Sequence, residues 1–126
     1  PPPPTPFPPP PLFRLHCTHG VPDFHGFIVL DIATGAAPVE VSRLTSDDRY
    51  EPHWTGWDAE TGRIVVNSKT PGERMYLLKL DSTSGALSID QAFRDADGKV
   101  GFGFESRRWP HGWTGDGTPH GAVFSR

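Results

Sequence analysis

The sequence predicts an all-β fold. Short runs rich in Val, Ile, Leu, Phe and Tyr alternate with clusters of Gly, Asp, Ser and Thr, which is the pattern of strands joined by tight turns. Helical periodicity is hard to find. The sequence also repeats itself after about fifty residues, and a repeat of this length made of four short strands is typical of the β-propeller. We therefore expect a partial β-propeller of about two four-stranded antiparallel blades.

The repeat is clearest in the segments FIVLDIATGAAPVEV and LLKLDSTSGALSIDQ. Asp31 aligns with Asp81 and Gly35 with Gly85, each pair at an offset of 50 residues. In both copies a strand ends in Asp, whose carboxylate can accept hydrogen bonds from the backbone N–H groups that follow. A Gly four residues later supplies the positive φ that a tight hairpin needs. The same Asp-x-x-Thr-Gly pattern at 58–62 predicts a third hairpin turn.

These patterns place the strands along the chain. We expect strands near 12–17, 26–31, 38–44, 53–57, 63–68, 74–80, 87–93 and 121–125. With the strands of a blade named A to D outward from the central channel, residues 12–44 would form strands B to D of a partial blade. Residues 51–93 would form a complete blade, and 118–126 the first strand of the next blade. The segment 94–117 is expected to be a long loop.

The first eleven residues, PPPPTPFPPPP, contain nine of the fifteen prolines. A run of this composition favours the polyproline II helix and has no apolar face to bury. We therefore expect a disordered Pro-rich segment over 1–11 that serves as a linker or chain start. The alternative is a ligand for an SH3 or WW domain.

About two blades cannot close a ring, because a propeller needs about four to eight. We favour a C-terminal piece of a larger propeller. The alternatives are a short protein that completes its core by oligomerising and an independent β-sandwich. The open blade edges predict association, either with the rest of a propeller or with another copy of the chain.

Composition argues against several classes of protein. The net charge is −3 with both signs mixed along the chain, so no basic stripe favours a nucleic-acid partner. The longest apolar run is far too short to span a bilayer, and no leader resembles a signal peptide. A single cysteine excludes an internal disulfide framework. We expect a soluble protein and favour the cytoplasm.

Two Pro-His pairs stand at the entrances to predicted innermost strands. Innermost strands of neighbouring blades run side by side around the channel, so His53 and His120 are expected to meet at one mouth of it. Pro52 and Pro119 restrict the backbone just before each histidine, which lowers the entropy lost in holding a ligand. The pairs therefore predict a shared site.

Neutral imidazole is the commonest ligand of transition metals, so these histidines suit copper, zinc, iron or nickel. His111, on the loop before the last strand, is a candidate third ligand, and Glu51 is the nearest carboxylate. The alternative is structural, because histidines at strand starts often cap backbone carbonyls or stack on tryptophan. Trp54 follows His53 directly.

A second group consists of His16, Cys17, His19 and His25. Its His-x-x-His spacing suggests zinc, but the repeat places it away from the channel, and there is no second Cys pair. The sequence gives no ground for an arrangement of base and orienting group that would activate Cys17 as a nucleophile. The aromatic residues over 102–113 are read as core and loop packing. The sequence also lacks a Gly-x-Ser-x-Gly motif, a P-loop and a dinucleotide fingerprint.

The segments GFIVLDIATG, YEPHW, GRIVVNSKTPGERMYLLKLDSTSGALSIDQAFRD and PHGAVFSR together resemble a known group of proteins. This group is the seven-bladed propellers that include selenium-binding proteins, methanethiol oxidases, lactonase-like propellers and YVTN-repeat proteins. The resemblance covers about 100 positions, at the C-terminal part of such a propeller.

The resemblance implies a function for the histidines. Methanethiol oxidases hold copper with channel histidines while they oxidise a small thiol, and His120 and His53 match that role. The expected function is therefore a metal-dependent oxidase, with copper favoured, a small-molecule substrate, His53, His111 and His120 as ligands, and Glu51 assisting proton transfer.

The departures from the family also matter. Its paired-histidine and Cys-x-x-Cys segments have no counterpart in this chain, so the resemblance assigns neither a whole copper site nor a selenium-binding cysteine. Lactonase-like relatives would use the same channel mouth for a sugar lactone. A non-catalytic propeller that serves as a protein-interaction scaffold is the remaining alternative.

Overall fold

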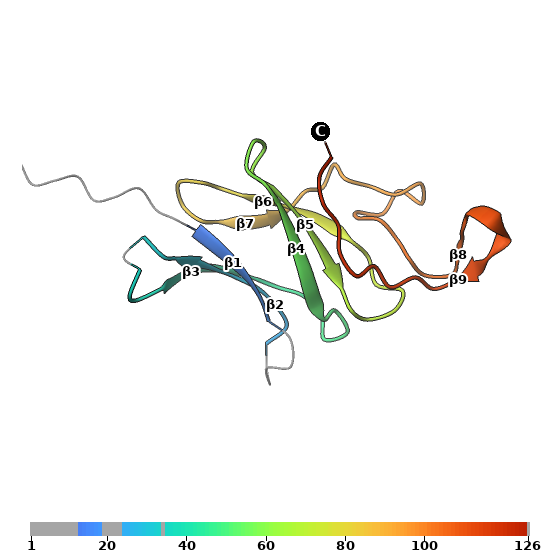
Figure 1. Ribbon diagram of the computed structural model, residues 1–126, viewed down its shortest axis with the longest axis horizontal. Helices are drawn as coiled ribbons and strands as arrows, with labels where there is room; N and C mark the ends of the chain where they lie inside the picture. Colours follow the sequence, from blue (N-terminus) through green and yellow to red (C-terminus); the bar gives the residue numbers. More distant parts are fainter. Residues whose placement is uncertain (1–12, 19–23, 34, 126) are drawn as a thin grey trace, which may run out of the picture.

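The computed structural model describes residues 13–18, 24–33 and 35–125, so the Pro-rich segment 1–11 lies outside the described residues. The fold is all-β, as the sequence predicts (Figure 1). The described residues form β1 (Phe13–Thr18), β2 (Gly26–Asp31), β3 (Val39–Thr45), β4 (Pro52–Asp58), β5 (Arg63–Ser68), β6 (Tyr76–Leu80), β7 (Leu87–Ile89), β8 (Arg107–Arg108), the short turn η1 (Pro110–Gly112) and β9 (Thr114–Gly115).

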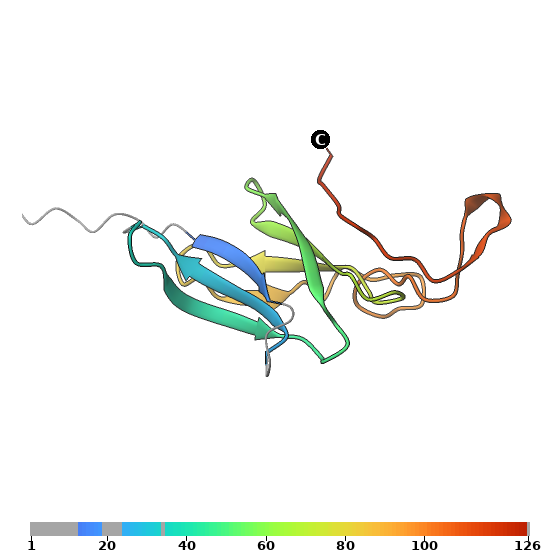
Figure 2. The same cartoon turned by 60° about the horizontal axis from the view of Figure 1, so that its bottom comes forward.

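The strands form two main antiparallel sheets, each in the order of the chain. One sheet has the order β1-β2-β3 and the other β4-β5-β6-β7. The two sheets lie against each other, with β1 beside β4 and β3 beside β7 (Figures 1 and 2). This is the arrangement of neighbouring blades in a partial propeller, in which β4 is the inner strand of the complete blade.

The predicted turn chemistry is present. The Asp81 carboxylate accepts hydrogen bonds from the backbone N–H groups of Thr83 and Ser84, at 2.9 and 2.8 Å. These bonds lower the pKa of Asp81, with the Ser84 N–H as the largest cause. Gly85 closes the turn at φ 76°, a conformation that favours glycine. In the turn at 58–62 the final Gly likewise has φ 68° and donates its N–H to the Asp58 carbonyl.

The core lies between the two sheets. Phe27 from β2 and Tyr50 from the connection into β4 pack against Ile64, Val66 and Leu78 of the complete blade. Partly buried residues complete the cluster: Leu44, Tyr76, Leu80, Leu87 and Ile89. Burial of each large side chain contributes about 1.5–3 kcal/mol. The alternate residues of β5 point to the opposite face of this blade.

Two parts of the chain differ from the expectation. The structure assigns no strand within 118–125, where the sequence predicts the first strand of another blade. That segment has the composition of a strand, but the partner strands of its own blade are not among the described residues. The predicted loop 94–117 contains a short hairpin, in which Arg107 pairs with Gly115 and Arg108 with Thr114.

Within the part of the chain that the structure describes, no helix has the length and apolar character needed to cross a membrane.

Candidate functional site

The structure places His53 and His120 in contact. Their ring centroids are 4.9 Å apart and the rings are inclined at 57°. His53 lies where the register between β4 and β5 shifts, since Pro52 pairs with Ser68 but Trp54 pairs with its neighbour Asn67. His53 is therefore the extra residue of a β-bulge, a feature that commonly re-aims a side chain next to a functional site.

His120 comes from the extended C-terminal segment, which is held by its backbone carbonyls. The Asn67 side-chain amide donates to the Pro119 carbonyl at 2.6 Å. The Trp54 indole N–H donates to the Ala122 carbonyl at 3.0 Å. Both donors come from the complete blade, so the backbone on either side of His120 is fixed against it.

Gly56 makes this close approach possible. A Cβ at position 56 would lie 2.5 Å from the Ala122 carbonyl oxygen and 2.9 Å from the Val65 side chain. Any side chain there would push the C-terminal segment away from β4. The contact between the two imidazoles thus depends on a glycine three residues after His53.

Asn67 carries an unused acceptor at this site. Its side chain is buried, with 1% of its surface exposed. Nδ2 is bonded to the Pro119 carbonyl, but Oδ1 has no hydrogen-bond partner among the described residues. Buried polar atoms nearly always find a partner, either in the protein or in ordered water. A bound molecule or water with an N–H or O–H would satisfy it.

Glu51 lies two residues before His53, as the sequence requires. Its carboxylate pairs with the Lys69 ammonium at 2.8 Å, and its backbone N–H donates to the Ser68 hydroxyl at 2.9 Å. The Lys69 N–H in turn donates to the Glu51 carbonyl. These bonds hold the chain just before the bulge. Proton transfer by Glu51 would require the ion pair with Lys69 to open.

The structure does not bring His111 to the other two histidines. His111 is exposed in η1, with φ 72°, at the turn of the β8–β9 hairpin. The hairpin projects away from β4 in both views (Figures 1 and 2). Within the hairpin, the Trp109 and Trp113 rings contact each other with centroids 6.1 Å apart. Among the described residues, no group of three or more His, Cys, Asp or Glu side chains could hold a metal ion.

The second histidine group is described only in part. His19 and the side chains of His16 and Cys17 lie outside the described residues. The backbone carbonyl of His25 accepts a hydrogen bond from the Ser46 N–H, and its buried Nδ1 has no partner in the described structure. Zinc binding by this group stays a hypothesis.

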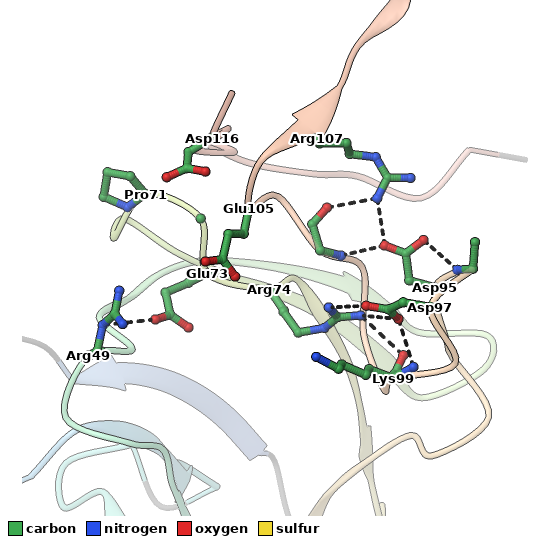
Figure 3. A pocket seen from close by; sticks show the side chains of 13 residues that line it. Arg49, Pro71, Glu73, Arg74, Asp95, Asp97, Lys99, Glu105, Arg107 and Asp116 are labelled. Carbon is green, nitrogen blue, oxygen red and sulfur yellow. Dashed lines mark hydrogen bonds and ion pairs between the residues drawn. The ribbon is translucent and has the colours of Figure 1, made fainter. Parts of the chain in front are cut away.

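A polar cavity of about 510 Å³ lies near the same end of the complete blade (Figure 3). The loop after β5 and the long loop after β7 form most of its wall. Its lining consists of Arg49, Pro71, Gly72, Glu73, Arg74, Asp95, Ala96, Asp97, Lys99, Gly103, Glu105, Arg107 and Asp116. Sequence analysis missed this cavity, because its charges come from loops without periodicity.

Most charges in the cavity wall neutralise one another. Arg74 pairs with Asp97 at 3.1 Å and also donates to backbone carbonyls of the long loop. Arg107 pairs with Asp95 at 2.7 Å, and the Gly103 N–H donates to the same carboxylate. The Arg107 hydrogen bond, followed by that of Gly103, holds the pKa of Asp95 far below its usual range.

Glu73 is a carboxylate of this wall whose pKa shifts in the direction opposite to that of Asp95. Partial burial, the largest cause, together with the nearby Asp47 and Glu105 carboxylates, raises its pKa. The Arg49 guanidinium opposes this shift from 3.7 Å. Figure 3 shows the Glu73 carboxylate directed toward the Arg49 guanidinium.

Two short segments of the chain connect the cavity wall with the histidine pair. Arg49 precedes His53 by four residues, and Asp116 precedes His120 by four. Because four residues span at most about 14 Å, the backbone of each histidine lies within that distance of one residue of the cavity wall.

No family model, curated protein or solved structure matches this chain. The fold defines the class, an all-β protein with neighbouring blades of a partial propeller. Within that class, the candidate site is the histidine pair at the start of the inner strand of the complete blade, together with the buried Asn67 amide.

Proposed function

We propose that this protein is part of a β-propeller that binds a transition metal at its channel mouth through His53 and His120. The contact between the two imidazoles, at 4.9 Å between centroids, carries the proposal. Neutral imidazole binds copper, zinc, iron and nickel well. The resemblance to methanethiol oxidases favours copper as the metal and a small thiol as the substrate.

The donor set fits an open metal site. Two imidazoles leave coordination positions for water, substrate or donors from outside the described residues, and open positions distinguish catalytic from structural sites. Asn67 supports the site through the backbone, since its Nδ2 donates to the Pro119 carbonyl next to His120. When bound, copper would supply Lewis acidity and electron transfer to dioxygen.

The residues around the pair have separate roles in this proposal. The bulge orients His53, and the bonds from Trp54 and Asn67 hold the backbone around His120. Glu51 is the nearest carboxylate by sequence and would move a proton after release from Lys69. The polar cavity would admit a small polar substrate.

Metal titration tests the proposal. The chain is titrated with Cu(II) and with Zn(II), and bound metal is measured after removal of the free ion. We expect about one equivalent in the wild type and loss of binding in His53→Ala and in His120→Ala. His111→Ala is the matched control and should retain the metal. Unchanged metal content in the first two variants would overturn the proposal.

The alternative is a non-catalytic scaffold for protein interaction. Exposed apolar side chains favour it, because Trp57 is 52% exposed and Val123 81% exposed. In a propeller these faces would be covered by neighbouring blades, or by another copy of the chain. Metal-free protein that still associates through these faces would support the scaffold instead of the oxidase.

A further inference from the structure

Four aromatic rings form a row from the body of the protein to the tip of the β8–β9 hairpin. Phe102 and Phe104 have ring centroids 5.3 Å apart, and Phe104 and Trp109 are 5.8 Å apart. Trp109 and Trp113 follow at 6.1 Å, inclined at only 31°. We name these four residues the aromatic ladder. Its outer end is open, since Trp113 is 57% exposed.

The outer end of the ladder is rigid. The Trp109 backbone N–H donates to the Trp113 carbonyl at 2.8 Å, and the Trp109 indole donates to the Gly115 carbonyl at 3.2 Å. The two indole rings lie against the backbone of neighbouring glycines. A Cβ at Gly115 would be 3.0 Å from the Trp113 ring. A Cβ at Gly117 would be 2.7 Å from the Trp109 ring. A surface held in this way loses little entropy when it binds a partner.

Trp113 also offers a hydrogen-bond donor to the outside. The indole N–H groups of Trp54 and Trp109 donate to carbonyls within the fold. No acceptor within the described residues takes the indole N–H of Trp113. An exposed indole face beside an available N–H is the surface that recognises proline-rich peptides. Pyrrolidine rings pack on the aromatic faces, and the solvated carbonyls of a polyproline II helix accept the hydrogen bond.

The chain itself contains such a peptide, PPPPTPFPPPP at 1–11. It carries no charged side chain, so it is not repelled by the neighbouring Arg107 and Arg108. Prolines are already restricted before binding, so little further entropy is lost. The composition of the peptide and the chemistry of the aromatic surface therefore match.

We propose that the Trp109–Trp113 end of the aromatic ladder is a docking site for the proline-rich segment 1–11 of a second copy of this chain. A second copy is the occupant because β1, which follows this segment, and the β8–β9 hairpin lie toward opposite ends of the molecule in both views (Figures 1 and 2). The site is separate from the histidine pair and does not depend on a metal.

Direct binding tests the docking surface. A fluorescently labelled peptide, PPPPTPFPPPP, is titrated with the full chain and its anisotropy is measured. We expect saturable binding that weakens at least about tenfold in Trp113→Ala, because exposed tryptophans often dominate such interfaces. Trp57→Ala removes another half-exposed tryptophan, from β4, and should bind normally. No saturable binding, or equal binding by Trp113→Ala, would overturn the proposal.

The occupant is tested by sedimentation of the full chain over a range of concentrations. We expect self-association that an excess of the unlabelled peptide reverses, and that a peptide with alternate prolines replaced by serine does not. The second copy is not the occupant if the labelled peptide binds but an excess of the unlabelled peptide does not reverse self-association. The same conclusion follows if the chain is monomeric at all concentrations.

Discussion

The histidine pair and the polar cavity lie near the same end of the complete blade but differ in how their polar groups are used. In the cavity wall, Asp95 and Asp97 each pair with an arginine. At the histidine pair, the buried Asn67 oxygen has no partner among the described residues. The aspartates of the cavity wall therefore bond within the protein, whereas the surroundings of the histidine pair keep an acceptor that no described residue satisfies.

Arg74→Met should have the largest effect on stability and should leave the histidine pair intact. Arg74 is mostly buried, and its loss would leave the carbonyls of Val100 and Gly101 without this donor. It would also break the ion pair with the half-exposed Asp97, which keeps its hydrogen bond from the Lys99 N–H. We expect a loss of about 2 kcal/mol, measured by urea unfolding, with unchanged metal affinity. A loss of stability below about 1 kcal/mol, or a parallel fall in metal affinity, would contradict the claim that Arg74 supports the fold independently of the histidine pair.

Asn67→Leu should lower the metal affinity and leave stability nearly unchanged, which is the reverse of Arg74→Met. The substitution removes an unsatisfied buried acceptor but leaves the Pro119 carbonyl without its donor, so we expect a change in stability within about 1 kcal/mol. Metal affinity should fall by about 10–100-fold, as for other residues that orient a metal ligand. Calorimetric titration with Cu(II) measures it. Full affinity in this variant would mean that Asn67 does not position His120.

Acid should weaken the cavity wall through Asp95. Its pKa is lowered in the folded state, so its stabilising contribution is complete above the unfolded pKa of about 3.9 and is lost as the pH falls toward the folded value. Stability of the wild type should therefore decrease below about pH 4. In Asp95→Asn the stability should be lower at neutral pH and should depend less on pH in this range. Identical pH profiles would contradict the role of the pair with Arg107.

The contribution of Glu73 to stability should depend on pH in the direction opposite to that of Asp95. Its effect should be the smallest of those predicted here. Its pKa is raised in the folded state, so its favourable contribution is complete below the unfolded pKa of about 4.3 and is lost as the pH rises through the folded value. Glu73→Gln should stabilise the protein slightly at pH 7, by less than about 1 kcal/mol, and should change little at pH 4. Thermal unfolding at both pH values measures this. Destabilisation at pH 7 would show that the pair with Arg49 outweighs the burial.

The sequence predicts strands and hairpin turns where the residues that determine them are neighbours in the chain. The predicted strands at 26–31 and 63–68 match β2 and β5, because a turn glycine or loop bounds each apolar run. The Asp-to-Gly hairpin turns follow from the preferences of Asp and Gly alone. The contact between His53 and His120 was expected from the repeat, but the structure assigns no strand to the segment that carries His120.

Other features depend on contacts that the sequence does not encode locally. Asn67 interrupts the apolar run RIVVNS, which is a signal, but its partner at Pro119 is 52 residues away. The polar cavity arises because Arg74 and Arg107 each meet an aspartate across long loops. His111 lies in the β8–β9 hairpin, which the fifty-residue repeat does not predict.

An NMR measurement tests most directly whether the blades bring His53 and His120 to one point. In a chain with labelled histidine rings, we expect nuclear Overhauser effects between the ring protons of these two residues, lost in His120→Ala. The His111 ring should show none to either. If the His53 ring shows effects only to its own sequence neighbours, the shared site does not exist.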